Sequence, residues 1–459
     1  MTKIEIKEQF KGYFKGLLGD VEAEQFFSTI EKKLEAPRSI RVNTLKLTKA
    51  ELSKWFTNQG YKVKESPYSS DGLELTGSGA EWALKLPYHA GFTYPQDAAS
   101  MFAVEVLNPQ PGERALDLTA APGGKSTHIA QRLGNRGVLV ANDMDTHRLK
   151  ALRSNLSRLG IVNTYISRMA AAKMAAIYPE TFDRILLDPS CSGEGLFVTD
   201  EGQPEYWNKK ALKHFSGLQF GLLRQAFQML KPGGRLVYST CALNAVENDG
   251  VVEDFLAKTP EAAIDEAALV ELKKRKIKVP KQLAGLKGIR FWPQHSKTKG
   301  FFCIALTKTR SQNLRAPEGR PALRTLKKDE RKIYDEYLKN FGISTAAYEW
   351  VPYEHHLFLI DPAVAELSPP PGFGLSLPAL KTYEGEEMKP SHEGAIFFGP
   401  LAKQGIAELS KEQMEHAMKH EALALKLKEG LYLAKYLQFP IGVLKIGFQR
   451  TELLVPKMA

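Results

Sequence analysis

Five short apolar runs, each about the length of one β-strand, follow one another along the middle of the sequence and are mostly separated by stretches with helical spacing. The runs are ALDL (115–118), VLVAND (138–143), NTYIS (163–167), RILLD (184–188) and RLVYST (235–240). Strands that alternate with helices predict a parallel sheet with helices on both faces. Two later runs, IRFWP (289–293) and GFFCIALTK (300–308), can close this sheet as an antiparallel pair. We therefore predict an α/β fold of the Rossmann-like kind.

The chain of 459 residues is too long for one ordinary core, so we expect several domains. The predicted α/β domain covers residues 93–309. A small α+β unit at 1–92 precedes it, because its middle part reads as strand, helix and strand. After the α/β domain we expect a linker with a small α/β domain at 310–388, and then a β-rich region at 389–459.

The net charge of +11 favours a polyanionic partner, although a protein can be basic without one. Arg38, Arg41 and Lys46 add positive charge to the N-terminal unit, as either a solvated face or an RNA-facing surface. The 3 cysteines are an odd number, which argues against a disulfide framework and fits a reducing cytoplasm. We see no signal peptide and no apolar run of about 18 residues, so we expect no membrane span.

The loop after the first strand, Thr119–Lys125 (TAAPGGK), has the composition of a ligand-binding loop. Its two glycines allow close approach of the backbone, and the helix that follows offers free N–H groups. A phosphate-binding loop nearly fits, but Thr119 stands where that pattern needs its first glycine, so a nucleotide triphosphatase is disfavoured. Asp143, at the end of the second strand, is placed to accept hydrogen bonds from a ribose. A cofactor with a ribose, such as S-adenosylmethionine, fits this combination.

Two cysteines follow the ends of the fourth and fifth strands. Asp188 ends the fourth strand, Cys191 comes three residues later, and Cys241 directly follows the fifth strand. Two cysteines at the tips of neighbouring strands, both in polar loops, are hard to explain by packing. Cys303 stands in an apolar run, and we interpret it as a small buried residue.

Four motifs together resemble the Nop/Sun family of RNA cytosine-5 methyltransferases. They are TAAPGGKST, AND-x-D-x-x-R, LLD-x-x-CSGEG and YSTC-x-L-x-x-x-END. The layout resembles the bacterial 16S ribosomal RNA enzymes that carry an N-terminal extension, and YPQDAASM and GFFCIAL also match it. The resemblance implies a class I S-adenosylmethionine-dependent methyltransferase domain at 93–309 and an RNA-binding platform at 1–92. More loosely, 389–459 resembles a PUA-like RNA-binding domain.

The resemblance also implies roles for individual residues. Cys241 would be the nucleophile that attacks cytosine, and Cys191 would assist release of the product. Asp188 would hold the ring nitrogen or exocyclic amine of the cytosine, with Lys125 pointing into the same site. The cofactor-binding residues would be Thr119, Ala120, Ala121, Pro122, Gly123, Gly124, Lys125, Asp143 and Asp188. We expect no metal.

Three departures from the family pattern stand out. Ala170 occupies the place where the family often has an aspartate near the adenine, and Ser190 replaces a proline before the first cysteine. Phe197-Val198-Thr199 stands where a basic pair is common. No implied catalytic residue is lost, so we expect activity on RNA, most simply on 16S ribosomal RNA within the small subunit, without an obligate protein partner. A transfer RNA methyltransferase and a non-catalytic ribosome-assembly factor are the alternatives.

Overall fold

The fold is described from a computed structural model of the chain. The structure describes residues 7–34, 36–199, 207–283, 287–314, 323–367, 374–382, 388–419, 421, 423, 425–447 and 451–454. Part of the predicted linker, 315–322, lies outside them. No helix among these residues is long and apolar enough to cross a membrane.

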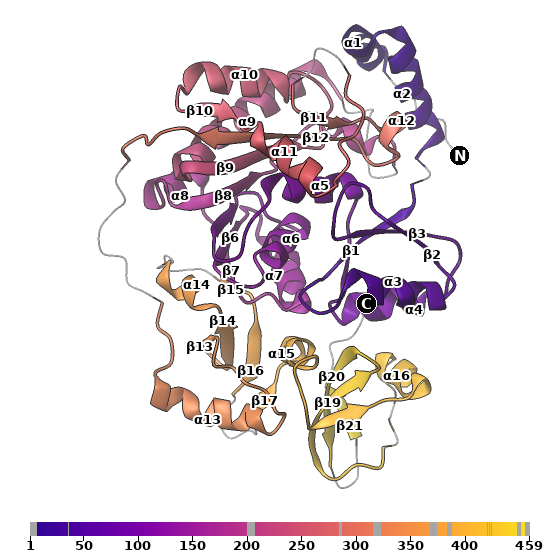
Figure 1. Cartoon of the computed structure of the whole chain (residues 1–459), viewed down its shortest axis with the longest axis vertical. Coiled ribbons are helices and arrows are strands. Elements are labelled where there is room, and N and C mark those ends of the chain that lie inside the picture. The colour runs from indigo at the N-terminus through magenta and orange to yellow at the C-terminus, as the bar shows by residue number, and fades with distance from the viewer. Residues whose placement is uncertain are drawn as a thin grey trace.

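A central sheet dominates the molecule, and its strand order is β10-β12-β9-β8-β5-β6-β7-β15, with β11 beside β12 (Figure 1). Its strands are β5 (Arg114–Asp117), β6 (Val138–Asn142), β7 (Thr164–Ser167), β8 (Phe182–Leu187), β9 (Leu230–Thr240), β10 (Ala262–Ile264), β11 (Ile289–Phe291), β12 (Phe301–Lys308) and β15 (Gly374–Leu375). The strands β5 to β9 are parallel, and β11 and β12 form the expected antiparallel addition. The predicted α/β fold is therefore confirmed, and β5 lies at the switch point where strand order reverses.

Helices cover both faces of this sheet, because successive strand residues point to opposite sides. Ala115 belongs to the core under one set of helices, and Leu116 belongs to the core under the other. The helices of the first set are α5 (Ala98–Leu107), α6 (Gly124–Arg132), α7 (Thr146–Leu159) and α11 (Ala267–Lys274). Those of the second are α8 (Ala171–Ile177), α9 (Lys209–Met229) and α10 (Asp249–Lys258).

The N-terminal unit has the expected strand, helix and strand inside a larger sheet of order β2-β3-β1-β4. Its elements are α1 (Glu8–Leu18), α2 (Asp20–Lys32), β1 (Arg38–Val42), α3 (Lys49–Asn58), β2 (Lys62–Glu65), β3 (Gly72–Thr76), α4 (Trp82–His89) and β4 (Thr93–Pro95). The helix α3 begins with a capping box of Thr48 and Glu51. The pair α1 and α2 packs against the methyltransferase-like domain, where Phe10 contacts Trp207 at 5.3 Å between ring centroids.

Arg41 and Lys46 do not form the solvated or RNA-facing surface that was expected. Arg41 is 1% exposed, and its guanidinium donates to the carbonyl oxygen of Gly124 at 2.5 Å and to Thr127 Oγ1 at 2.6 Å. The ammonium of Lys46 donates to three carbonyl oxygens, among them Ala90 and Ile396. Both cations therefore hold elements of different domains together, and only Arg38 of the three is exposed.

Two small sheets occupy the lower part of Figure 1. One has the order β13-β14-β16-β17, and the other has the order β18-β19-β20-β21. Their elements are α13 (Lys328–Lys339), β13 (Glu349–Tyr353), β14 (His356–Ile360), α14 (Pro362–Glu366), β16 (Pro378–Lys381), β17 (Lys389–Pro390), α15 (His392–Phe398), β18 (Ile406–Glu408), α16 (Lys411–Met418), β19 (Gly430–Tyr436), β20 (Phe439–Ile446) and β21 (Thr451–Leu454). The last sheet shares a core with the N-terminal unit, where the ring centroids of Trp55 and Phe439 lie 4.8 Å apart.

Candidate active site

The neighbouring strands β5, β8 and β9 end at one edge of the sheet, and each is followed by a predicted site residue. Lys125 Nζ lies 2.7 Å from Asp188 Oδ2. The hydroxyl of Ser239 donates to Asp188 Oδ1 at 2.8 Å, and the backbone N–H of Asp188 donates to Thr119 Oγ1 at 3.1 Å. The Asp188 carboxylate is therefore fixed by groups from both neighbouring strands.

An open cavity of about 400 Å³ lies at this edge. The residues that line it are Tyr94, Pro95, Gln96, Asp97, Ser100, Asp117, Thr119, Ala120, Ala121, Pro122, Gly124, Lys125, Asp188, Leu196, Cys241, Lys299, Gly300 and Phe301. Most of the predicted site residues lie here, and Gly123, Asp143 and Cys191 do not line the cavity itself.

The two predicted cysteines lie together. The thiols of Cys191 and Cys241 are within hydrogen-bond distance of each other, and both side chains are half-buried. The hydrogen bond to Cys241, together with burial, raises the pKa of Cys191 well above its ordinary value. Cys303 is fully buried on β12, as predicted.

Lys125 keeps its charge in this partly closed site. Burial lowers the pKa of Lys125, but Asp188, Asp117 and Cys241 together bring the net shift above its ordinary value. The ammonium also lies 5.3 Å from the ring centroid of Phe301. The site therefore presents a fixed positive charge beside Cys241.

The glycine-rich loop is held by contacts with the end of the second parallel strand. Gly123 has a φ of +107°, which favours glycine, and it caps α6. Asp143 Oδ2 accepts the backbone N–H of Ala121 at 3.0 Å, and Arg148 donates to the carbonyl oxygen of Ala121. Asp143 thus lies against the loop, and Arg148 supports the loop from outside.

Asp117 is a site residue that the sequence interpretation missed. It ends β5 and is 1% exposed, and its Oδ2 accepts a hydrogen bond of 2.6 Å from the hydroxyl of Ser126. Its Oδ1 is buried without a partner in the described structure and the residue lines the cavity. Burial raises the pKa of Asp117 to about 7. An acid directly before a glycine-rich loop was the available signal, and its orphaned oxygen fits the ammonium group of S-adenosylmethionine.

The rest of the cavity lining comes from segments far apart in the sequence. Tyr94 and Asp97 come from β4 and the start of α5, and Lys299 and Phe301 come from the turn into β12. Asp97 is half-buried and caps α5, and its Oδ2 accepts the backbone N–H of Lys299 at 3.2 Å. Their motifs, YPQDAASM and GFFCIAL, were part of the family resemblance, but no role was assigned to them.

The departures from the family pattern have structural counterparts. Phe197 and Val198 are buried in the core that α1 and α2 share with the methyltransferase-like domain. The backbone N–H of Leu34 donates to the carbonyl oxygen of Val198 at 2.8 Å. This segment therefore packs against the N-terminal helices. Ser190 is exposed, and its carbonyl oxygen accepts a hydrogen bond from Gln219 Nε2 at 3.0 Å. Ala170 is the N-cap residue of α8 and does not line the cavity.

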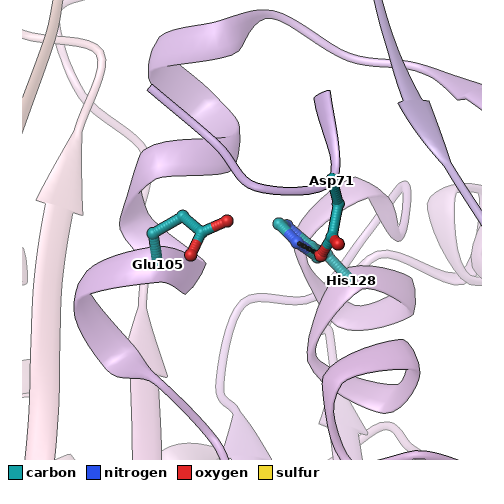
Figure 2. A group of neighbouring side chains, drawn as sticks. All are labelled: Asp71, Glu105 and His128. Carbon is teal, nitrogen blue, oxygen red and sulfur yellow. Dashed lines mark hydrogen bonds and ion pairs between the residues drawn. The ribbon is translucent and has the colours of Figure 1, made fainter. Parts of the chain in front are cut away.

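Three buried side chains of metal-ligand type lie close together away from this cavity, and Figure 2 shows them on α5, α6 and the loop before β3. His128 Nε2 lies 3.0 Å from Asp71 Oδ2, and Glu105 is the third member. Arg132 lies 3.7 Å from Asp71, and Arg275 pairs with Glu105. Since two arginines balance two carboxylates, we interpret the group as an ion-pair network that joins the N-terminal unit to the central domain.

Comparisons with known proteins agree with this geometry. The family 16S rRNA methyltransferase RsmB/F matches residues 104–307, and the N-terminal domain of 16S rRNA methyltransferase RsmF matches residues 6–98. The ribosomal RNA small subunit methyltransferase F of Aeromonas salmonicida is 30% identical over 408 residues, which cover 86% of this chain and 84% of the relative. This chain belongs to the RsmB/F family. The family resemblance drawn from the four motifs is thereby confirmed.

Another relative and two solved structures match over a shorter length. The methyltransferase F of Klebsiella pneumoniae is 36% identical over 293 residues, so the match spans 62% of this chain and about 60% of that relative. A methyltransferase homologue from Pyrococcus horikoshii is 32% identical, with a TM-score of 0.58 over 66% of this chain and 95% of that one. NSun6 from the same organism, solved with the S-adenosylmethionine analogue SFG, is 25% identical, with a TM-score of 0.56 over 66% of this chain and 99% of that one. These structures confirm the class I methyltransferase fold and support the predicted cofactor.

Proposed function

We propose that this chain transfers a methyl group from S-adenosylmethionine to carbon 5 of a cytosine in 16S ribosomal RNA, through a covalent bond between Cys241 and the base. The observation that carries the proposal is a pair of free thiols at the edge of the methyltransferase cavity, beside an aspartate that a buried lysine holds in place. Membership of a family of 16S rRNA methyltransferases supports the choice of RNA.

The reaction needs a nucleophile because carbon 5 of cytosine reacts weakly on its own. The Cys241 thiolate adds to carbon 6 and turns carbon 5 into an enamine-like carbon. Asp188, fixed by Lys125 and Ser239, accepts a hydrogen bond from the ring edge and stabilises the protonated base. Bound S-adenosylmethionine supplies an electrophilic methyl group. Cys191 then assists loss of the proton on carbon 5, after which the bond between Cys241 and carbon 6 breaks.

The cofactor and the base take opposite sides of the cavity. The loop from Thr119 to Lys125 would hold the methionine and ribose part, with Asp143 toward the ribose and Asp117 toward the ammonium. The target cytosine has to leave its stack to enter the cavity, which Tyr94 and Phe301 also line. This arrangement brings the base within reach of Cys241.

The flanking units would bind the rest of the RNA. The net charge of +11 supports a polyanionic substrate. We assign RNA binding to the N-terminal unit, 1–92, and to the C-terminal region, 389–459, where the small sheet of β18 to β21 is compatible with a PUA-like fold. The proposed substrate is the RNA of the small ribosomal subunit in the cytoplasm.

Transfer of labelled methyl from S-adenosylmethionine tests this function. Total RNA and small ribosomal subunits from cells that lack this gene are incubated with the protein, and the RNA is digested and mapped. We expect label on 5-methylcytosine in 16S ribosomal RNA. Label on transfer RNA would keep the chemistry and replace the substrate. Absence of label, with the cofactor still bound, would favour the assembly-factor alternative.

A further inference from the structure

Two buried glutamates lie behind the cysteine pair, and the proposed chemistry does not use them. Glu194 opens a short 3₁₀ turn, Glu194–Leu196, just after Cys191, and Glu247 lies just before α10. Both are fully buried. Every hydrogen-bond partner that we find for their carboxylates in the described part of the chain is neutral. These partners are Ser192, Gln219, Asn244, the indole N–H of Trp207 and the backbone N–H of Leu243.

The hydrogen bonds around Ser192 favour one proton shared by the two carboxyl groups. Ser192 Oγ lies 2.8 Å from Glu194 Oε1 and also contacts Glu247 Oε1, and it accepts Asn244 Nδ2 at 3.1 Å. A hydroxyl has one hydrogen, so it can donate to only one of the two carboxyl groups. The second contact becomes a hydrogen bond when that carboxyl group is protonated and donates to the hydroxyl. Burial, and then the charge of Glu194, raise the pKa of Glu247 to about 7, in agreement with a shared proton.

The pair therefore keeps one negative charge, and this charge lies on the Cys191 side of the thiol pair. Ser192, which bridges the two carboxyl groups, is the residue next to Cys191, and both glutamates act electrostatically on the Cys191 thiol. Lys125 instead faces Cys241, which lines the cavity with it. The two hydrogen-bonded thiols are therefore close to charges of opposite sign. Cys191 is near the negative glutamate pair, and Cys241 is near the positive Lys125.

We propose that the Glu194–Glu247 pair keeps the proton of the thiol pair on Cys191, so that Cys241 is the thiolate. The pair acts through Cys191 and is a positioning element. Its role deepens the proposed function, because it explains which of two adjacent cysteines becomes the nucleophile. As a thiol, Cys191 donates a hydrogen bond to the Cys241 thiolate and stabilises it.

Alkylation of the free protein tests the proposal without RNA or cofactor. The wild-type chain is treated with iodoacetamide at pH 6.0, where the glutamate pair still holds its proton, and the rate at each cysteine is read by peptide mass spectrometry. Buried Cys303 should stay unmodified, which checks that the protein remains folded. We expect Cys241 to react at least about tenfold faster than Cys191. Glu247→Gln imitates the protonated member and should keep this ratio. Glu194→Gln/Glu247→Gln removes the charge, and the ratio should fall by about tenfold because Cys191 ionises more readily.

A pH profile keeps the test decisive if the double variant fails to fold, as judged by circular dichroism. The titratable groups that face Glu247 and Glu194 are Cys191, Tyr238 and Tyr13, and burial raises the pKa of both tyrosines above their ordinary value. Between pH 6 and 8 the wild-type pair loses its shared proton and gains a second negative charge. The ratio of the Cys241 rate to the Cys191 rate should therefore rise more steeply in wild type than in Glu247→Gln.

The exposed Glu253→Gln on α10 is the matched control and should reproduce the wild-type profile. Equal rates at both cysteines in wild type, an unchanged ratio in a folded double variant, or identical pH profiles in wild type and Glu247→Gln would overturn the proposal. Failure of methyl transfer would leave these alkylation rates unaffected, so the two failures are distinguishable.

Discussion

Lys125 Nζ lies 2.7 Å from Asp188 Oδ2, so the catalytic-site lysine and the aspartate proposed to face the cytosine form one ion pair across two neighbouring strands. The side chains are 15% and 25% exposed. Because both side chains are partly buried, the charge of each residue is neutralised mainly by the other. The following predictions start from this pair and from the groups around it.

Asp188→Asn should lower kcat by about 100-fold or more, because the charge that stabilises the protonated base is lost. The unfolding free energy should fall by about 1–3 kcal/mol, since Lys125 keeps its burial and loses its partner. Single-turnover methyl transfer and urea denaturation measure the two effects. Glu113→Gln is the matched control, because Glu113 pairs with Arg184 at 2.9 Å with similar exposure outside the cavity. If Glu113→Gln lowered kcat as strongly, Asp188 would have no special role in the chemistry.

Asp117→Asn should weaken binding of S-adenosylmethionine and remove its pH dependence. Burial raises the pKa of Asp117 to about 7, and only the ionised carboxylate can pair with the ammonium of the ligand. The wild-type affinity should therefore fall by about tenfold from pH 8 to pH 6, as titration calorimetry measures. An equal affinity at both pH values in wild type would contradict this role.

Asp117 should also affect how the unfolding free energy of the ligand-free protein depends on pH. The folded-state pKa of Asp117 lies above its unfolded value, so its contribution to stability is full below about pH 4 and is lost as the pH rises through about 7. Asp117→Asn should flatten the dependence of the unfolding free energy on pH over this window.

Arg41→Met should lower the unfolding free energy by about 2–4 kcal/mol, because a buried guanidinium that holds the start of α6 is lost and its acceptors remain unpaired. Arg38→Met, at an exposed position three residues earlier, should change it by less than about 0.5 kcal/mol. Denaturant unfolding measures both. Filter binding should show unchanged RNA affinity for folded Arg41→Met. A large loss of RNA affinity would instead indicate that Arg41 contacts RNA.

The sequence was sufficient for those parts of the site that follow parallel strands. Because the carboxyl ends of such strands meet at one edge, Asp188 and Cys241 could be placed together from the strands that they follow, whereas the family resemblance implied the position of Lys125. The presence of Cys191 beside Cys241 followed from the same argument. The structure agrees with each of these placements.

Other features depend on tertiary contacts that no local pattern encodes. Asp117 was counted as part of an apolar strand, and only the fold reveals its orphaned oxygen in the cavity. Lys46 is enclosed by carbonyl oxygens from three separate segments, which a charge pattern cannot distinguish from a solvated lysine. The contact of Glu194 and Glu247 with one Ser192 hydroxyl likewise arises only in the folded chain.

The measurement that tests the central claim most directly is capture of a covalent protein–RNA complex on a denaturing gel, with 16S ribosomal RNA and S-adenosylmethionine present. Cys191→Ala should accumulate a complex that resists denaturation, because the base stays bonded to Cys241 when release is impaired. Cys191→Ala/Cys241→Ala should form none, and Cys241→Ala should transfer no methyl group. A fully active Cys191→Ala without a complex, or a complex that persists in the double variant, would contradict the roles assigned to the two cysteines.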